Sequence, residues 1–178
     1  LVDGGVDNDK LDFSGGHSNL IAKGGEGADT LVLEGTVSGT GNRFYGGKDN
    51  DSIEIQTGAA VAVHGDNEDD KITLSAVKSA ASVFGGAGID TLNLSAALAD
   101  STLTAKGNAG NDDIDGSNAE ADETIYGGQG DDNISGTGNG SRSYYGDKGD
   151  DVIFIGSNEA SMASGGEGAD TIRVDTVV

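Results

Sequence analysis

A short pattern that returns nine times constrains this chain more than any other feature of its sequence. Each copy opens on a glycine, and the first glycines lie 19 to 22 residues apart, beginning at Gly4 and ending at Gly165. A period of about 20 residues kept along a whole chain is typical of a solenoid, in which each repeat forms one coil stacked on the next. The sixth position of every copy is aspartate, and these nine residues are Asp9, Asp29, Asp51, Asp70, Asp90, Asp112, Asp132, Asp151 and Asp170.

Apolar residues alternate with polar ones around this pattern. The eighth position is aliphatic in all nine copies, and the tenth is apolar in all but two, which carry Gly116 and Gly136. A further apolar position lies two residues before each first glycine. The two-residue period predicts two short strands per coil, each with one buried face. The far-side segments between them, such as 34–41 and 95–101, share no pattern and are expected to absorb the variation in period.

The charge balance limits the partners of such a solenoid. The chain has 31 acidic against 10 basic residues, a net charge of −21, and no cysteine. The acidic excess argues against nucleic acid or anionic lipid, which require a basic surface. The lack of cysteine excludes disulfides and thiolate metal sites, and no run is apolar enough to span a membrane. Because so acidic a chain repels itself, we expect a cationic partner to join the fold.

No break in the pattern divides the chain. Proline is absent and no long polar linker interrupts the repeats, which predicts one domain over residues 1–178. The chain begins at Leu1 rather than methionine, so we expect a piece of a larger secreted protein. Neither end carries a capping helix, and the terminal coils, 1–13 and 165–178, are expected to fray or to contact absent neighbours.

The best copies, GGEGADTLV at 24–32 and GGEGADTIR at 165–173, resemble the GGxGxDxUx nonapeptide of the repeats-in-toxin (RTX) family of calcium-binding β-rolls. The resemblance extends over residues 4–174. In that family six residues form a turn, three form a short strand, and calcium lies between stacked turns. The resemblance implies an all-β fold, a right-handed parallel β-roll or β-helix of about nine coils, with the calcium-binding turns on one side.

The residue types suit calcium. This ion takes about six to eight oxygen ligands, which stacked turns can supply through carboxylates and carbonyls, and glycine permits the backbone angles that aim those carbonyls. Glycine and aspartate also favour metal-free turns, but that alternative does not explain aspartate at one position nine times. Nine turns leave eight gaps, so we expect up to eight Ca²⁺ ions in one row. The expected ligands are the nine aspartates with the backbone of Gly24, Gly46, Gly85, Gly107, Gly127, Gly146 and Gly165.

Some copies depart from the nonapeptide. Position two is Asp66, Asn108 or Asp147 in three copies, and position four is acidic in others. Asp and Asn tolerate left-handed backbone conformations, so these turns are expected to form, with most of the extra carboxylates facing solvent. The fourth copy, which contains Asp70, departs furthest. The far side lacks the motif apart from Gly15-Gly16, which predicts a single row of ions.

The position just before each copy should point outward and forms an aromatic and cationic stripe. Two interpretations stay open: strand-favouring side chains that stack on their neighbours, or a surface for glycan or protein. The only histidines, His17 and His64, lie in different coils, so a zinc site or a nucleophile triad is not expected. The stripe consists of Lys23, Tyr45, His64, Phe84, Lys106, Tyr126, Tyr145 and Ser164.

The sequence therefore predicts a non-enzymatic, secreted, calcium-binding module that folds when calcium binds, at a cell surface. The RTX resemblance implies export by type I secretion and a structural or adhesive role, as in surface-layer proteins and adhesins, with self-association or a cell-surface glycan as further partners. Two alternatives remain: the non-catalytic tail of a secreted hydrolase or toxin, and a carbohydrate-binding module.

Overall fold

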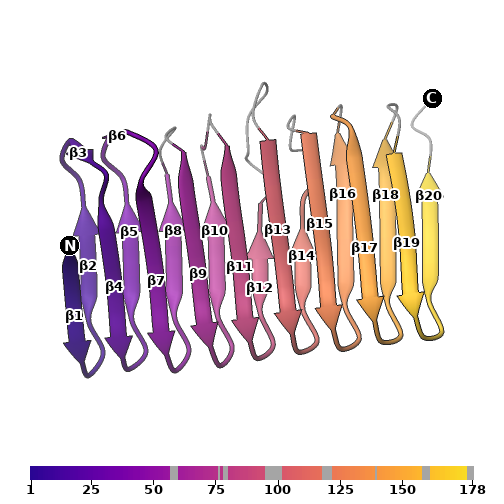
Figure 1. The fold of residues 1–178 in the computed structure, drawn as a ribbon, viewed down its shortest axis with the longest axis horizontal. Helices are drawn as coiled ribbons and strands as arrows, with labels where there is room; N and C mark the ends of the chain where they lie inside the picture. The colour runs from indigo at the N-terminus through magenta and orange to yellow at the C-terminus, as the bar shows by residue number, and fades with distance from the viewer. Residues whose placement is uncertain are drawn as a thin grey trace.

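The computed structural model describes residues 1–56, 60–75, 77, 80–94, 102–117, 122–138, 140–157 and 161–175. The far-side segment 95–101 lies outside these residues. All described elements are β-strands, and they run parallel within two long sheets (Figure 1). None of the described segments is a helix long and apolar enough to cross a membrane.

The first sheet holds nine strands, each hydrogen-bonded only to the equivalent strands of the coils before and after it. These strands contain the residues before each repeat together with its first three residues. They are β1 (Val2–Val6), β4 (Ile21–Glu26), β7 (Asn42–Lys48), β9 (Val61–Asn67), β11 (Ala81–Ala87), β13 (Thr102–Ala109), β15 (Asp122–Gln129), β17 (Arg142–Lys148) and β19 (Ser161–Glu167).

The second sheet also holds nine strands and begins at the seventh position of each repeat. A third sheet of only two strands, β3 (His17–Ser18) and β6 (Val37–Ser38), joins the far-side turns of the first two coils. The strands of the second sheet are β2 (Lys10–Phe13), β5 (Thr30–Leu33), β8 (Ser52–Ile55), β10 (Lys71–Leu74), β12 (Thr91–Asn93), β14 (Asp113–Asp115), β16 (Asn133–Gly138), β18 (Val152–Ser157) and β20 (Thr171–Asp175).

The register repeats from coil to coil. Leu31, for example, pairs with Leu11 of the preceding coil and Ile53 of the following one. In Figure 1 the strands of the first sheet descend in front, those of the second ascend behind, and the chain advances from left to right. The coil is therefore right-handed, and the predicted parallel β-solenoid is confirmed.

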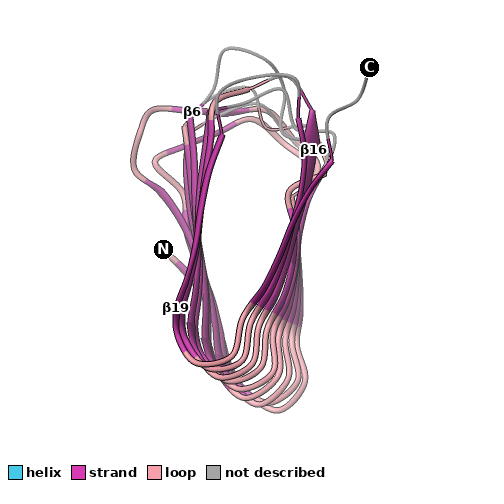
Figure 2. Cartoon of the chain, turned by 90° about the vertical axis from the view of Figure 1, so that its right-hand side faces the viewer, coloured by secondary structure: helices cyan, strands magenta, loops and turns pink. Residues whose placement is uncertain are grey.

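The core lies between the two sheets, which face each other when viewed along the stack (Figure 2). The eighth position and the position two residues before each repeat are buried in the inner coils, as Ile72 and Val83 illustrate with no exposed surface. Each such aliphatic side chain contributes about 1.5–3 kcal/mol to folding. In the terminal coils, Val2 is exposed at 41% and Ile172 at 43%, whereas Leu11 stays buried.

The turn is shorter than the family pattern implies. The strands of the first sheet continue to the third residue of most repeats, so only positions four to six turn the chain. Pairing between neighbouring coils explains the difference: Gly25, at position two, pairs with Gly5 and Gly47. These backbone groups are therefore satisfied as parts of strands.

The two glycines at position ten make room for a buried polar cluster. A Cβ on Gly136 would overlap the Tyr144 hydroxyl, and one on Gly116 would stand 2.9 Å from Oε2 of Glu123. That Oε2 accepts a 2.7 Å hydrogen bond from the Tyr144 hydroxyl and pairs with the buried guanidinium of Arg142. Glycine at these two apolar positions is thus compensated by larger side chains on the facing strands.

Candidate metal centre

The sixth-position aspartates form a continuous ladder along the row of turns. In each of the first eight coils the aspartate N–H donates to Oδ1 of the aspartate in the following coil, over 2.7 to 3.1 Å. The ladder begins at Asp9 and ends at Asp170. It fixes the carboxylate of every coil after the first against the preceding coil and satisfies one of its two oxygens.

The other carboxylate oxygen is buried in the same eight coils and has no hydrogen-bond partner among the described residues. Leaving a buried charged group unpaired is costly, and native proteins normally pair it with a cation or a hydrogen-bond donor. Eight such oxygens in one file therefore indicate a row of cation sites. They are Oδ2 of Asp9, Asp29, Asp51, Asp70, Asp90, Asp112, Asp132 and Asp151.

The first glycine of each repeat leaves space beside that oxygen. A Cβ on Gly24 would overlap Oδ2 of Asp29 and stand 2.6 Å from the carbonyl oxygen of Gly46 in the next coil. A carboxylate oxygen and a carbonyl oxygen thus approach one small volume, which any side chain would fill. The overlap with the repeat's own aspartate recurs at Gly46, Gly85, Gly107, Gly127, Gly146 and Gly165.

Gly4 and Gly65 have the same surroundings but were missing from the expected ligands. A Cβ on Gly65 would overlap Oδ2 of Asp70 and lie 2.5 Å from the carbonyl oxygen of Gly85. Both occupy the first position of their repeats, and this position alone was reason to count them among the expected ligands. The divergent fourth repeat therefore has the same local geometry as the others, and Asp70 is only 2% exposed.

Burial raises the pKa of the seven ladder carboxyls from Asp29 to Asp151. It raises the pKa of Asp70 to about 8, of Asp51 and Asp132 to about 7, and of Asp90 and Asp112 to about 6. The hydrogen bond from the preceding aspartate's N–H acts in the opposite direction but does not outweigh burial. Without a cation, the row therefore favours protonated carboxyls, because ionised ones lack solvation.

A second ladder of side chains runs beside the first at position five, where six of the nine repeats carry Asn or Asp. The Ile89 N–H donates to Asp69 Oδ1 over 2.7 Å, and the Asp131 N–H donates to Asn111 Oδ1 over 3.0 Å. These bonds join consecutive turns in the opposite direction to the first ladder. They add a cross-link between coils at the solvent-facing edge of the turns.

The described part of the chain holds no group of three or more His, Asp or Glu side chains close enough to bind a metal ion. A cation in this row would therefore take most of its ligands from the backbone. The polar atoms found beside the first glycines are carboxylate and carbonyl oxygens, which suit a hard ion such as calcium better than zinc. The extra carboxylates of Asp7, Asp49 and Glu68 are exposed, as expected.

Comparison with known families points to the same repeat. The family described as RTX calcium-binding nonapeptide repeat (4 copies) matches residues 104–120 and 119–139, which belong to the sixth and seventh coils. Searches of curated proteins and of solved structures gave no match. The family match shows RTX calcium-binding repeats at residues 104–139, and together with the right-handed parallel β-solenoid it fits an RTX β-roll.

Proposed function

We propose that the row of turns holds up to eight calcium ions and that their binding drives the folding of the chain. The observation that carries the proposal is the file of eight buried Oδ2 atoms without partners. The carboxylates of the nine aspartates and the carbonyls of the first glycines, Gly4 and Gly65 included, supply the ligands. Eight divalent ions would offset 16 of the 21 net negative charges.

Folding and binding are linked because the oxygens meet only when two coils are stacked. An ion that binds the stacked state and not the open chain stabilises the former by RT ln(1 + [L]/Kd) for each site. When bound, calcium supplies the positive charge that the buried carboxylates lack. The chain's own contribution is the ladder of N–H to Oδ1 bonds, which holds each Oδ2 at the gap between coils.

We further propose that the module works outside the cell, in a structural or adhesive protein. Extracellular calcium modules bind with Kd values of about 10⁻⁴ to 10⁻³ M, so such a chain would remain open in low-calcium cytosol and fold after export. RTX repeats typically occur in secreted proteins, which supports this location. A surface-layer or adhesin-type protein exported by type I secretion uses the resulting rod as a rigid spacer.

Titration of the chelator-treated chain with calcium, followed by far-UV circular dichroism, tests the proposal. We expect a cooperative gain of β structure in calcium and none in equimolar magnesium, which demands a tighter octahedral site. Isothermal calorimetry then counts the ions per chain. Full β structure in chelator at neutral pH would contradict calcium-driven folding.

A further inference from the structure

The outer face of the first sheet carries the aromatic and cationic stripe as a stack of rings. Tyr45 and Phe84 lie on either side of the His64 ring, with centroid distances of 4.9 and 4.7 Å, and Tyr126 stacks on Tyr145 at 4.9 Å. Stacking between neighbours therefore uses many of the ring faces. A ligand on this side must be held mainly by something other than stacking on these rings.

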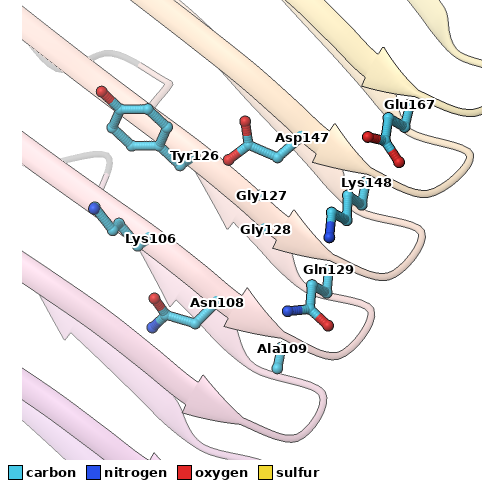
Figure 3. Close-up of a pocket in the computed structure, with 10 residues that line it drawn as sticks. All are labelled: Lys106, Asn108, Ala109, Tyr126, Gly127, Gly128, Gln129, Asp147, Lys148 and Glu167. Atoms are coloured by element: carbon cyan, nitrogen blue, oxygen red, sulfur yellow. The ribbon is translucent and has the colours of Figure 1, made fainter.

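Two grooves beside the stripe offer such a binding place. Each contains a lysine, a tyrosine and an aspartate at equivalent positions of the repeat. One has a volume of about 700 Å³ and contains Lys23, Tyr45 and Asp66. The other has a volume of about 580 Å³ and contains Lys106, Tyr126 and Asp147 (Figure 3).

In each groove the three side chains come from three successive coils. Each groove is floored by a glycine pair of the middle coil, 46–47 in one and 127–128 in the other. Figure 3 shows Asn108 and Asp147 on the two strands that flank Gly128, with Tyr126 just before the glycine pair on the middle strand. The same arrangement therefore occurs twice in the chain, four coils apart.

The walls of the grooves depart from the nonapeptide at a cost to the backbone. Asp66, Asn108 and Asp147 replace the glycine of position two and adopt φ angles of 85°, 83° and 77°. Left-handed angles are unfavourable for residues with a Cβ. None of these three side chains makes a hydrogen bond to the described residues that would offset this cost. All three line the two grooves.

We propose that each groove binds a neutral saccharide. The second groove is lined by Lys106, Lys148, Asp147 and Glu167, and the first by Lys23, Asp3 and Asp66. Both grooves therefore mix the two signs of charge, and neither carries the large excess of one sign that would select a strongly charged ligand. Hydroxyl groups both donate and accept hydrogen bonds, and can therefore satisfy Asp147 and Lys106 together. The bare glycine floor lets a flat sugar ring approach the backbone.

The two grooves should act as a pair. Four coils separate equivalent residues, which at about 4.8 Å per coil places the grooves roughly 19 Å apart on one face. A short oligosaccharide is expected to bind twice per chain, and a polysaccharide to bridge both grooves with a gain from effective concentration.

The test uses the calcium-loaded chain on an array of neutral, acidic and amino-sugar oligosaccharides, followed by calorimetry with the tightest neutral binder. Asp66→Gly and Asp147→Gly restore the residue of the repeat, so both variants keep a backbone that suits the positive φ angle while removing the groove's acceptor. We expect two sites in the native chain, one in each single variant, and at least about tenfold weaker binding in the double variant. Asp113→Asn, on the exposed face of the second sheet, is the matched control and should bind normally.

Circular dichroism in calcium establishes that each variant is folded before its binding is read. Absence of binding to every neutral oligosaccharide by the native chain would overturn the proposal. Undiminished binding by the double glycine variant, or binding restricted to acidic glycans, would overturn it equally. None of these outcomes bears on calcium-driven folding, which is measured separately.

Discussion

The backbone N–H of Asp70 donates a 2.8 Å hydrogen bond to Oδ1 of Asp90 in the next coil, while Oδ2 of Asp90 is buried without a partner. One carboxylate thus joins two coils through one oxygen and leaves the other to a cation. The two roles can be separated by mutation.

Asp90→Asn keeps an oxygen that can accept the hydrogen bond from Asp70 but removes the negative charge. We expect calcium-driven folding to require at least about tenfold more calcium, because a charge-bearing ligand is lost. Asp90→Ala removes both interactions and should also lower stability at saturating calcium. Calcium titrations followed by circular dichroism, then urea unfolding at saturation, measure the two effects. Equal calcium midpoints for Asp90→Asn and the native chain would show that Asp90 is not a ligand.

Gly127→Ala tests the space at the first position of the repeat. The added methyl group would overlap Oδ2 of Asp132 and stand 2.8 Å from the carbonyl oxygen of Gly146, so we expect about 1–3 kcal/mol of destabilisation and weaker calcium binding. Gly16→Ala is the control, because its nearest atom is Oγ1 of Thr36 at 3.8 Å. Urea unfolding with and without calcium measures the stability of both variants. A similar loss of stability in Gly127→Ala and Gly16→Ala would refute a specific role for Gly127.

At low pH, protonation of the buried aspartates should partly substitute for calcium in stabilising the stacked coils. The pKa of Asp70 rises to about 8 and that of Asp51 to about 7 in the stacked state, above the usual value of about 3.9 for the open chain. The stacked state therefore binds more protons than the open chain, so its stability is greatest below about pH 4 and is lost as pH rises through about 6 to 8.

Far-UV circular dichroism of the calcium-free chain between pH 4 and 9 checks that stability falls as pH rises, with sedimentation to exclude aggregation. We expect more β structure at pH 5 than at pH 8 without calcium, and little difference in saturating calcium. A calcium-free chain that gains structure as pH rises would contradict the burial of these carboxyls.

Removing only one partner of the buried ion pair between Glu123 and Arg142 should strongly destabilise the fold. Arg142→Leu leaves a buried carboxylate without its guanidinium, and we expect it to destabilise the calcium-loaded rod by about 3–5 kcal/mol. Glu123→Leu with Arg142→Leu removes both charges and should cost clearly less. Urea unfolding of the single and double variants gives the coupling energy, and additive effects would mean that the pair does not interact.

Sequence periodicity alone predicted the coils and the row of aspartates, because each depends on one residue type returning at one position. Ile53 and Asp51 show this: their neighbours along the rod are their own equivalents in other repeats. The buried polar cluster was not predictable in this way. Gly136 is compensated by Tyr144 on the facing strand, a contact between different columns of the repeat.

The fifth-position ladder was also missed, although Asn and Asp are common there. An outward turn residue such as Asp150 can bond to its own turn, to solvent or to either neighbouring coil, and only the stacked geometry selects the Ala169 N–H. The pairing of glycines at position two likewise depends on neighbouring coils, so the family pattern overstated the length of the turn.

The strand-to-strand hydrogen bonds of both sheets run along the axis of the stack. A pull on the two ends of the rod therefore loads these bonds one coil after another instead of all together. Each coil that detaches would release about 65 Å of extended chain in exchange for about 4.8 Å of rod. We expect such a rod to yield in steps, dissipating mechanical work at each coil, and, under the calcium-driven folding proposed above, to re-form in calcium when the tension is released.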